Sequence, residues 1–299
     1  AQSVEKIRTD VRVINRELLN NSYTIDQLRQ TFENNPAIKL LIKEKDYING
    51  TMSEVQVIPS FDTVDINEAL SSLYNSKGID EHLGSYVKAL YTNKFKIPKG
   101  KQSININLDN AVLSKSDVVI LDIIANNVDR PIYFSAWSND NFLSLEDYLT
   151  LEGFAYRLNF EKNNSQTEII EQKAGTIDSE KMYDNVMHGF SFKHFDKNIY
   201  FNETERNIIS YYVQNLSSLA YKLLQEGENE KALSVLNKSI TAIPFEIHSY
   251  PLFLVDMALM YSILEEKEMA SNLMKHSIKE FKRYMNKYFV ASMRMQAQQ

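Results

Sequence analysis

A capped and almost wholly apolar helix is predicted to begin at Ser114. Ser114 can accept a hydrogen bond from the backbone of Asp117, and the Asp117 carboxylate can accept one in return, which makes a capping box. The turns that follow have little polar surface, because they contain Val118, Val119, Ile120, Leu121, Ile123 and Ile124. A helix that is apolar around most of its circumference is buried. The chain must therefore supply a sheet and further helices to cover it.

The residues after this helix predict an α/β arrangement. Pro131 disfavours helical geometry at Arg130, so Ile132–Phe134 is predicted to be a short buried strand. A second capped helix is expected from Ser144 and another strand from Phe154. Alternation of helix and strand is typical of an α/β domain. We assign residues 1–175 to such a domain, three-layer-like and with a mostly parallel sheet.

Several further elements are predicted before Ser114. β-Branched residues or apolar alternation predict strands at Asp10–Ile14, at Val55–Ile58 and, half-exposed at a sheet edge, at Ile104–Leu108. Apolar residues spaced three and four apart predict amphipathic helices after Thr24, after Asp65 and over Asp80–Thr92.

The last third of the chain contains an internal repeat. Leu216, Ala220 and Ala232 recur 38 residues later as Leu254, Ala258 and Ala270. This spacing is typical of tetratricopeptide helix pairs, which we favour over a generic bundle for residues 204–299. Residues 176–203 form an aromatic-rich connector. A groove in the helical array is predicted to bind a partner through Tyr212, Leu216, Tyr250 and Tyr261.

Composition excludes several classes of function. The net charge of −6 argues against a nucleic-acid or anionic-membrane surface, which would need a basic patch. The absence of cysteine excludes disulfides, thiolate metal sites and Cys nucleophiles. The sequence holds neither a GxGxxG nor a GxxxxGK[ST] motif, and Asp80–His82 is read as a helix cap rather than as a metal site. We therefore assign no catalytic residue, metal or cofactor.

The loop Trp137–Phe142 is the best candidate for a ligand site. It follows a predicted strand and precedes a predicted helix N-terminus, where open α/β sheets bind ligands. A sugar or an anion is the expected ligand, with contacts from Trp137, Asn139, Asp140 and Asn141. The alternative is an ordinary strand-to-helix turn in which Trp137 packs inward.

A short motif around Thr63 suggests a modification site. Asp62-Thr63-Val64 resembles the Asp-Ser/Thr-aliphatic acceptor pattern of O-glycosylation in Bacteroidetes. Thr63 is accordingly a candidate O-glycan acceptor.

Six sequence blocks together resemble one protein family. They begin at Arg8-Thr-Asp-Val-Arg-Val-Ile, Leu121-Asp-Ile-Ile-Ala-Asn, Arg130-Pro-Ile-Tyr-Phe, Leu145-Glu-Asp-Tyr-Leu, Glu180-Lys-Met-Tyr-Asp-Asn and Asn198-Ile-Tyr-Phe. In order and spacing they resemble the C-terminal part of the Bacteroidetes multi-pass membrane proteins of domain-of-unknown-function family 2723. The resemblance covers nearly the whole chain.

The resemblance implies a membrane location. It implies transmembrane helices before Ala1, related to protein O-mannosyltransferases and other lipid-sugar-dependent glycosyltransferases, which tether this portion to the periplasmic side of the inner membrane. The catalytic acid of such transferases lies in the membrane part, so the resemblance assigns no catalytic role to these residues.

The expected function is therefore a non-catalytic one. This portion would position an acceptor protein or glycan for its own transmembrane region, or bind a partner protein. One alternative is an α/β transferase or hydrolase domain that uses acids near Asp140 and Glu146, although Glu146 and Asp147 also suit a helix N-terminus. Another alternative is a stand-alone tetratricopeptide-like scaffold.

Overall fold

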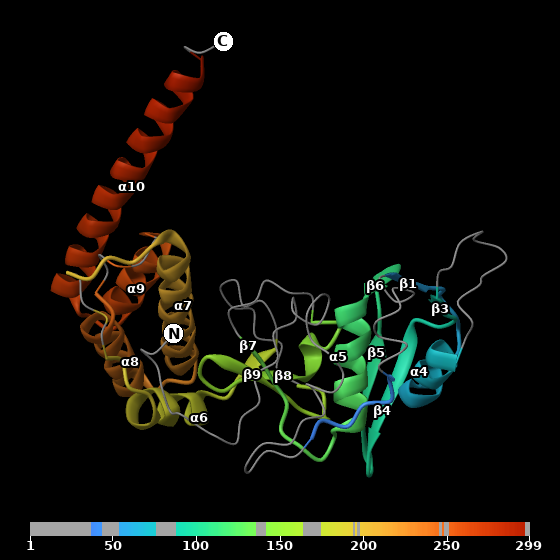
Figure 1. The fold of residues 1–299 in the computed structure, drawn as a ribbon. Coiled ribbons are helices and arrows are strands. Elements are labelled where there is room, and N and C mark those ends of the chain that lie inside the picture. The colour runs from blue at the N-terminus through green and yellow to red at the C-terminus, as the bar shows by residue number, and fades with distance from the viewer. Residues whose placement is uncertain are drawn as a thin grey trace.

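A strand-rich part is followed by a helical part along the chain (Figure 1). The computed structural model describes residues 37–43, 54–75, 88–135, 142–163, 175–193, 195, 198–244, 247 and 251–296. The expected α/β-then-helical layout is confirmed at this level. The strand predicted at Asp10–Ile14 and the helix predicted after Thr24 lie outside the described residues.

Two three-stranded sheets form the first half of the strand-rich part. In one, β1 (Glu54–Val57) lies between β3 (Lys88–Leu90), to which it is parallel, and β6 (Val112–Ser114), to which it is antiparallel. In the other, β4 (Lys94–Lys99) lies between β2 (Val64–Asp65) and β5 (Gln102–Asn107). In β5, Ile104 and Ile106 are buried while Asn105 and Asn107 are exposed, as predicted for an edge strand.

The expectation of a mostly parallel sheet is wrong. Four of the seven strand pairings among the described residues are antiparallel. Tight connections explain this outcome, because two residues between β4 and β5 suffice to join antiparallel strands, whereas parallel strands need a crossover.

The prediction of a helix over Asp80–Thr92 is also wrong for residues 88–92, which are the part of this range that the structure describes. Lys88–Leu90 forms β3, with Lys88 and Leu90 buried and Ala89 half-buried. Pairing with β1 therefore decides the conformation of a segment whose apolar spacing also suits a helix.

Helices α4 and α5, the two α-helices described before residue 135, follow their sequence signals. Helix α5 (Lys115–Asn126) begins with the predicted capping box, in which the Ser114 N–H donates to Asp117 Oδ2 at 2.9 Å. Its side chains Val118, Val119, Leu121 and Ile124 are fully buried. Helix α4 (Ile66–Asn75) packs against α5 and buries Ile66, Leu70, Leu73 and Tyr74.

A four-stranded sheet completes the strand-rich part. Its order is β10 (Thr176–Ile177), β8 (Leu149–Leu151), β9 (Ala155–Leu158) and β7 (Tyr133–Ser135). The strand predicted at Ile132–Phe134 exists, but it is an edge strand whose side chains are half-buried or exposed rather than buried. The strand predicted from Phe154 is confirmed as β9, which forms an antiparallel hairpin with β8.

The helix predicted from Ser144 is wrong. Leu143 and Ser144 have φ angles of 56° and 59°, which are not those of a helix N-cap. A single 3₁₀ turn, η1 (Glu146–Tyr148), follows and leads directly into β8. Burial of Leu143, Leu145 and Tyr148 holds this short turn against the sheet.

The helical part consists of two helix pairs after a short connector. Helix α6 (Ser179–Asp184) continues as a π-helical turn, η2 (Asn185–Gly189). The first pair is α7 (Glu203–Gln225) with α8 (Asn229–Ala242), and the second is α9 (Pro251–Ile263) with α10 (Lys267–Gln296). Figure 1 shows the last half of α10 projecting away from the other helices.

Long apolar helices are not a feature of the described chain. In those ranges, no helix combines the length and the apolarity needed to cross a membrane.

Candidate functional site

The tip of the β8–β9 hairpin, Glu152–Phe154, joins the strand-rich part to the helical part. The Glu152 N–H donates to Ala155 O at 3.1 Å across the turn. Gly153 lies at the centre of the turn with a φ of +131°, which side chains rarely adopt. A Cβ atom at Gly153 would lie 2.7 Å from the Phe190 Cζ atom, so glycine also permits the aromatic ring of the connector to pack on the turn.

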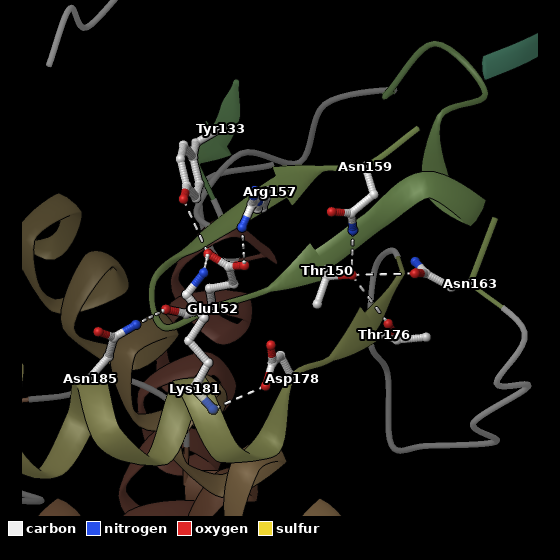
Figure 2. Close-up of polar contacts among 10 residues, drawn as sticks. All are labelled: Tyr133, Thr150, Glu152, Arg157, Asn159, Asn163, Thr176, Asp178, Lys181 and Asn185. Atoms are coloured by element: carbon white, nitrogen blue, oxygen red, sulfur yellow. Dashed lines mark hydrogen bonds and ion pairs between the residues drawn. The ribbon is translucent and has the colours of Figure 1, made fainter. Parts of the chain in front are cut away.

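The Glu152 carboxylate is the centre of a paired polar cluster (Figure 2). It lies 2.7 Å from Lys181 Nζ of α6 and 3.3 Å from Arg157 NH1 of β9, and its side chain is 7% exposed. The Tyr133 hydroxyl donates to the same carboxylate at 3.1 Å. A buried carboxylate needs such partners, because removing it from water without them is costly.

The backbone of the hairpin tip is also held from the connector. Asn185 Nδ2 of the π-helical turn donates to Glu152 O at 2.8 Å. The Lys181 N–H donates to the Asp178 carboxylate at 3.0 Å, which caps the N-terminus of α6. Figure 2 shows Lys181 and Asn185 rising from this one helical segment toward the hairpin tip. The connector thus binds the tip through both charge and backbone hydrogen bonds.

Electrostatics in the cluster act on Tyr133. Partial burial and the neighbouring Glu152 charge raise the pKa of the Tyr133 hydroxyl above its ordinary value of 10.0. The hydroxyl is therefore a hydrogen-bond donor to Glu152 at neutral pH.

A second set of polar side chains stiffens the sheet beside the cluster. Asn159 Nδ2 donates to Thr150 Oγ1 at 2.8 Å, and Asn163 Nδ2 donates to Leu149 O at 2.7 Å. The Thr150 hydroxyl also lies 3.5 Å from the Thr176 hydroxyl of β10 (Figure 2). These contacts join β8, β9 and β10 on the same side of the sheet.

The other face of the hairpin tip is aromatic. The Phe154 ring stacks on Phe190 at a centroid distance of 5.0 Å and meets Phe192 edge-on at 6.0 Å. It also lies 4.7 Å from the Tyr212 ring of α7. Burial raises the pKa of Tyr212. Aromatic pairs at these distances stabilise an interface beyond the area they bury.

Helix α8 contacts the connector from the opposite side. Lys238 Nζ donates to Met187 O at 2.9 Å and lies 5.8 Å from the Phe192 ring centroid. Burial lowers the pKa of Lys238. The connector is therefore fixed between the hairpin tip and the first helix pair.

A separate buried carboxylate, Asp122, holds another segment of the chain. Its oxygens accept hydrogen bonds from Leu41 N at 2.9 Å, Ile42 N at 3.0 Å and the Tyr74 hydroxyl at 2.9 Å. Burial raises the pKa of Asp122, although the hydrogen bonds from these partners oppose the effect. No sequence motif points to a role for Asp122. The available signal was a single acid within an otherwise apolar buried helix.

Both buried carboxylates are paired within the protein. The carboxylates of Glu152 and Asp122 are each surrounded by donors from the protein itself. Across the described ranges, no three His, Cys, Asp or Glu side chains lie close enough to hold a metal ion.

The predicted ligand loop falls outside the described residues. This applies to Trp137, Asn139, Asp140 and Asn141. The flanking chain does not support the reasoning behind the prediction, because β7 pairs antiparallel with β9 and no helix of useful length starts at Ser144. On the far side of the loop, Phe142 is buried and packs edge-on against Phe134 and Tyr156. The loop itself stays a prediction.

The acids of the enzyme alternative have ordinary surroundings where they are described. Asp147 is exposed and forms a surface ion pair with Lys162 at 2.9 Å. Glu146 is half-buried in the 3₁₀ turn.

The predicted groove residues are distributed between the core and the junction. Leu216 and Tyr261 are buried, and the Tyr261 hydroxyl donates to Asn237 Oδ1 at 2.9 Å. Neither side chain is therefore exposed to a partner. Tyr212 packs in the aromatic cluster of the hairpin tip, and Tyr250 lies outside the described residues.

Thr63 is exposed in the loop before β2. The preceding carbonyl, Asp62 O, accepts a hydrogen bond from the Thr92 hydroxyl at 2.9 Å, which anchors the loop. The location suits a modified residue, and O-glycosylation of Thr63 stays a prediction.

One family comparison gives a match. The model of a family described as TMEM260-associated domain 2 matches residues 1–105 and 85–181, which together make up more than half of the chain. The match includes the hairpin tip and ends at Lys181 in α6, so it does not extend into the helix pairs. No match is found among curated proteins or among solved structures.

Proposed function

The chain belongs to the family of TMEM260-associated domain 2, and from this premise we propose that it is a non-catalytic accessory portion of a membrane protein. The family is a membrane-protein-associated domain. In this proposal the present chain lies outside the bilayer and assists the membrane-embedded part, which is the catalytic part.

The sequence blocks support a more specific version of this role. Leu121–Asn126, Arg130–Phe134 and Glu180–Asn185 belong to the blocks that resemble the Bacteroidetes membrane proteins of family 2723. On that resemblance, the membrane part is a lipid-sugar-dependent glycosyltransferase. The present chain then lies on the periplasmic side and positions an acceptor protein or glycan.

The hairpin-tip junction is the observation that carries the proposal. Glu152 is neutralised by Lys181 and Arg157, and Phe154 is enclosed by Phe190 and Tyr212. These contacts fix the position of the helical part relative to the strand-rich part. A rigid junction of this kind suits an accessory portion that holds an acceptor at a fixed position relative to the membrane part.

The helix pairs supply the partner-binding half of the proposed role. The repeat residues Leu216, Ala220 and Ala232 are buried, as are their counterparts Leu254 and Ala258. This pattern supports a tetratricopeptide-like array, a fold whose stacked helix pairs create extended binding surfaces.

The test disrupts the junction in the full-length membrane protein. Phe154→Ser removes the aromatic contacts of the hairpin tip. We expect glycosylation of acceptor proteins in the native host, measured by mass spectrometry, to fall severalfold while the amount of protein in the membrane is unchanged. Tyr200→Ser is the matched control, because Tyr200 is 84% exposed in the connector, and it should leave glycosylation intact.

Two results would count against the proposal. Unchanged glycosylation after removal of residues 1–299 would show that the membrane part needs no such portion. Turnover of a lipid-linked sugar by the purified chain alone would support the enzyme alternative instead.

A further inference from the structure

The middle of α10, from Ile278 to Met285, carries an exposed apolar stripe. Ile278, Phe281 and Met285 are 48%, 36% and 66% exposed. They are spaced three and four residues apart, so they lie on the same side of the helix. The sequence continues this spacing with Tyr288 and Phe289.

Basic side chains border the stripe. Lys275, Lys279, Lys282 and Arg283 are all exposed. One acid, Glu280, lies in the same stretch and is 3.4 Å from Arg283. The chain as a whole has a net charge of −6, so this positive charge is local to α10.

The described chain does not cover this surface. Helix α9 has 13 residues and α10 has 30, so the second half of α10 runs past the end of its partner. Figure 1 shows that half, which includes Met285, standing apart from the other described elements. Ile278 and Phe281 lie just before it, and their exposed fractions show that the described chain leaves them open as well. Apolar side chains that stay exposed in a row along a helix indicate a binding surface rather than a core.

We propose that residues 275–286 of α10 bind the surface of an anionic lipid bilayer. A helix with a stripe of apolar residues bordered by lysine or arginine can lie in the bilayer interface, with its apolar side chains among the acyl chains. Basic residues near an anionic leaflet add electrostatic attraction. The long lysine side chains can keep their charge at the headgroups while their stems cover apolar surface.

The charge also argues against the main alternative occupant, a second copy of the chain. Two such helices packed through their apolar stripes would bring their basic residues together and repel each other. An anionic surface, in contrast, complements this charge.

The inference goes beyond the proposed function and does not depend on it. The acceptor-positioning role concerns the junction and the helix pairs, whereas bilayer binding concerns α10 alone. The bulk charge of the chain predicts no anionic-membrane surface, and the proposal departs from that prediction for one helix.

Vesicle co-sedimentation of the purified whole chain tests the proposal. We expect binding to vesicles of phosphatidylcholine with about a third phosphatidylglycerol, weakening as salt screens the charges, and at least tenfold weaker binding to phosphatidylcholine alone. The triple variant Lys279→Gln, Lys282→Gln and Arg283→Gln should bind about 100-fold more weakly, since each basic residue near such a surface contributes about fivefold.

Matched apolar variants distinguish binding through the α10 stripe from non-specific hydrophobic binding. Phe281→Ser with Met285→Ser should weaken binding at least tenfold. Leu259→Ser with Ile263→Ser removes two apolar side chains on α9 that are 54% and 67% exposed, and should leave binding unchanged. Circular dichroism should show full helix content for both pairs, because all four side chains are on the surface.

Three outcomes would overturn the proposal. The first is that the wild-type chain does not bind anionic vesicles. The second is that the α9 and α10 variants lose vesicle binding equally. The third is that the wild-type chain forms a dimer that the α10 variants abolish. The last would assign the stripe to a second copy.

Discussion

Asp122 holds a separate segment of chain against α5. It accepts hydrogen bonds from the backbone of Leu41 and Ile42, while Asn126 Nδ2 donates to it at 2.8 Å from the next turn of α5. Asn127 adds a pair of hydrogen bonds to the backbone of Lys39, at 3.0 and 2.8 Å. Asp122 and Asn127 thus bind backbone groups of residues 39–42, which in a sheet would be bound by a neighbouring strand.

Asp122→Asn should destabilise the fold by about 2 kcal/mol, because an amide N–H₂ would face backbone donors that need an acceptor. Urea denaturation measures the change. Asp109→Asn, at an exposed aspartate, is the matched control and should shift stability by less than about 0.5 kcal/mol.

The deficit of Asp122→Asn should depend on pH. In the unfolded chain the Asp122 carboxyl has its ordinary pKa of 3.8, and burial raises this pKa in the folded chain. At a pH between the ordinary and the raised pKa, the folded chain therefore keeps a proton that the unfolded chain has lost. The stabilising contribution of Asp122 is thus full below about 3.8 and declines as the pH rises through the raised pKa. The deficit should be largest at acidic pH, and a deficit that grows with pH would contradict this assignment.

Gly153 is the residue that lets the hairpin tip and the connector meet. Gly153→Ala should cost about 2–4 kcal/mol, because it combines backbone strain with a contact against Phe190. Gly100→Ala is a matched control, since Gly100 also has a positive φ but no atom within 4 Å of its added Cβ. It should cost about 1 kcal/mol in urea denaturation. Equal costs at the two positions would show that Phe190 moves aside freely.

At the scale of elements, the two helix pairs share one turn geometry. Gly227 N donates to Leu224 O and Glu228 N to Leu223 O, while Glu265 N donates to Ser262 O and Glu266 N to Tyr261 O. These are the paired hydrogen bonds of a Schellman motif. Gly227 and Glu265 have φ angles of 78° and 64°, so the second turn places a glutamate where the first has glycine.

Glu265→Gly should therefore stabilise the chain by about 0.5–1 kcal/mol, because it relieves a left-handed conformation that glycine adopts without strain. The reciprocal change, Gly227→Glu, should lower stability by about 1 kcal/mol. Thermal denaturation of both variants measures the difference. A lower melting temperature for Glu265→Gly would mean that the side chain makes a contact worth more than the strain.

Elements with local signals were predictable, and elements decided by distant contacts were not. The start of α5 is fixed by Ser114 and Asp117, which lie three residues apart, so the sequence alone identified it. Lys88–Leu90 and the residues after Ser144 carry helix-like patterns, but pairing with β1 and entry into β8 override them. The hairpin-tip site was not predicted, because Glu152, Lys181 and Phe190 are brought together only by the fold.

In the whole molecule, the strand-rich part and the helical part are expected to unfold as one cooperative unit. The strand-rich part, the connector and the first helix pair meet at Phe154, and buried residues of both parts form a continuous core. The last half of α10 projects away from these parts (Figure 1).

Differential scanning calorimetry of the whole chain tests the central claim, which is that the hairpin tip couples the two parts. We expect one cooperative transition for the wild-type chain and for Tyr200→Ser, and two separate transitions for Phe154→Ser. Two transitions in the wild-type chain, or a single one in Phe154→Ser at an unchanged temperature, would contradict it.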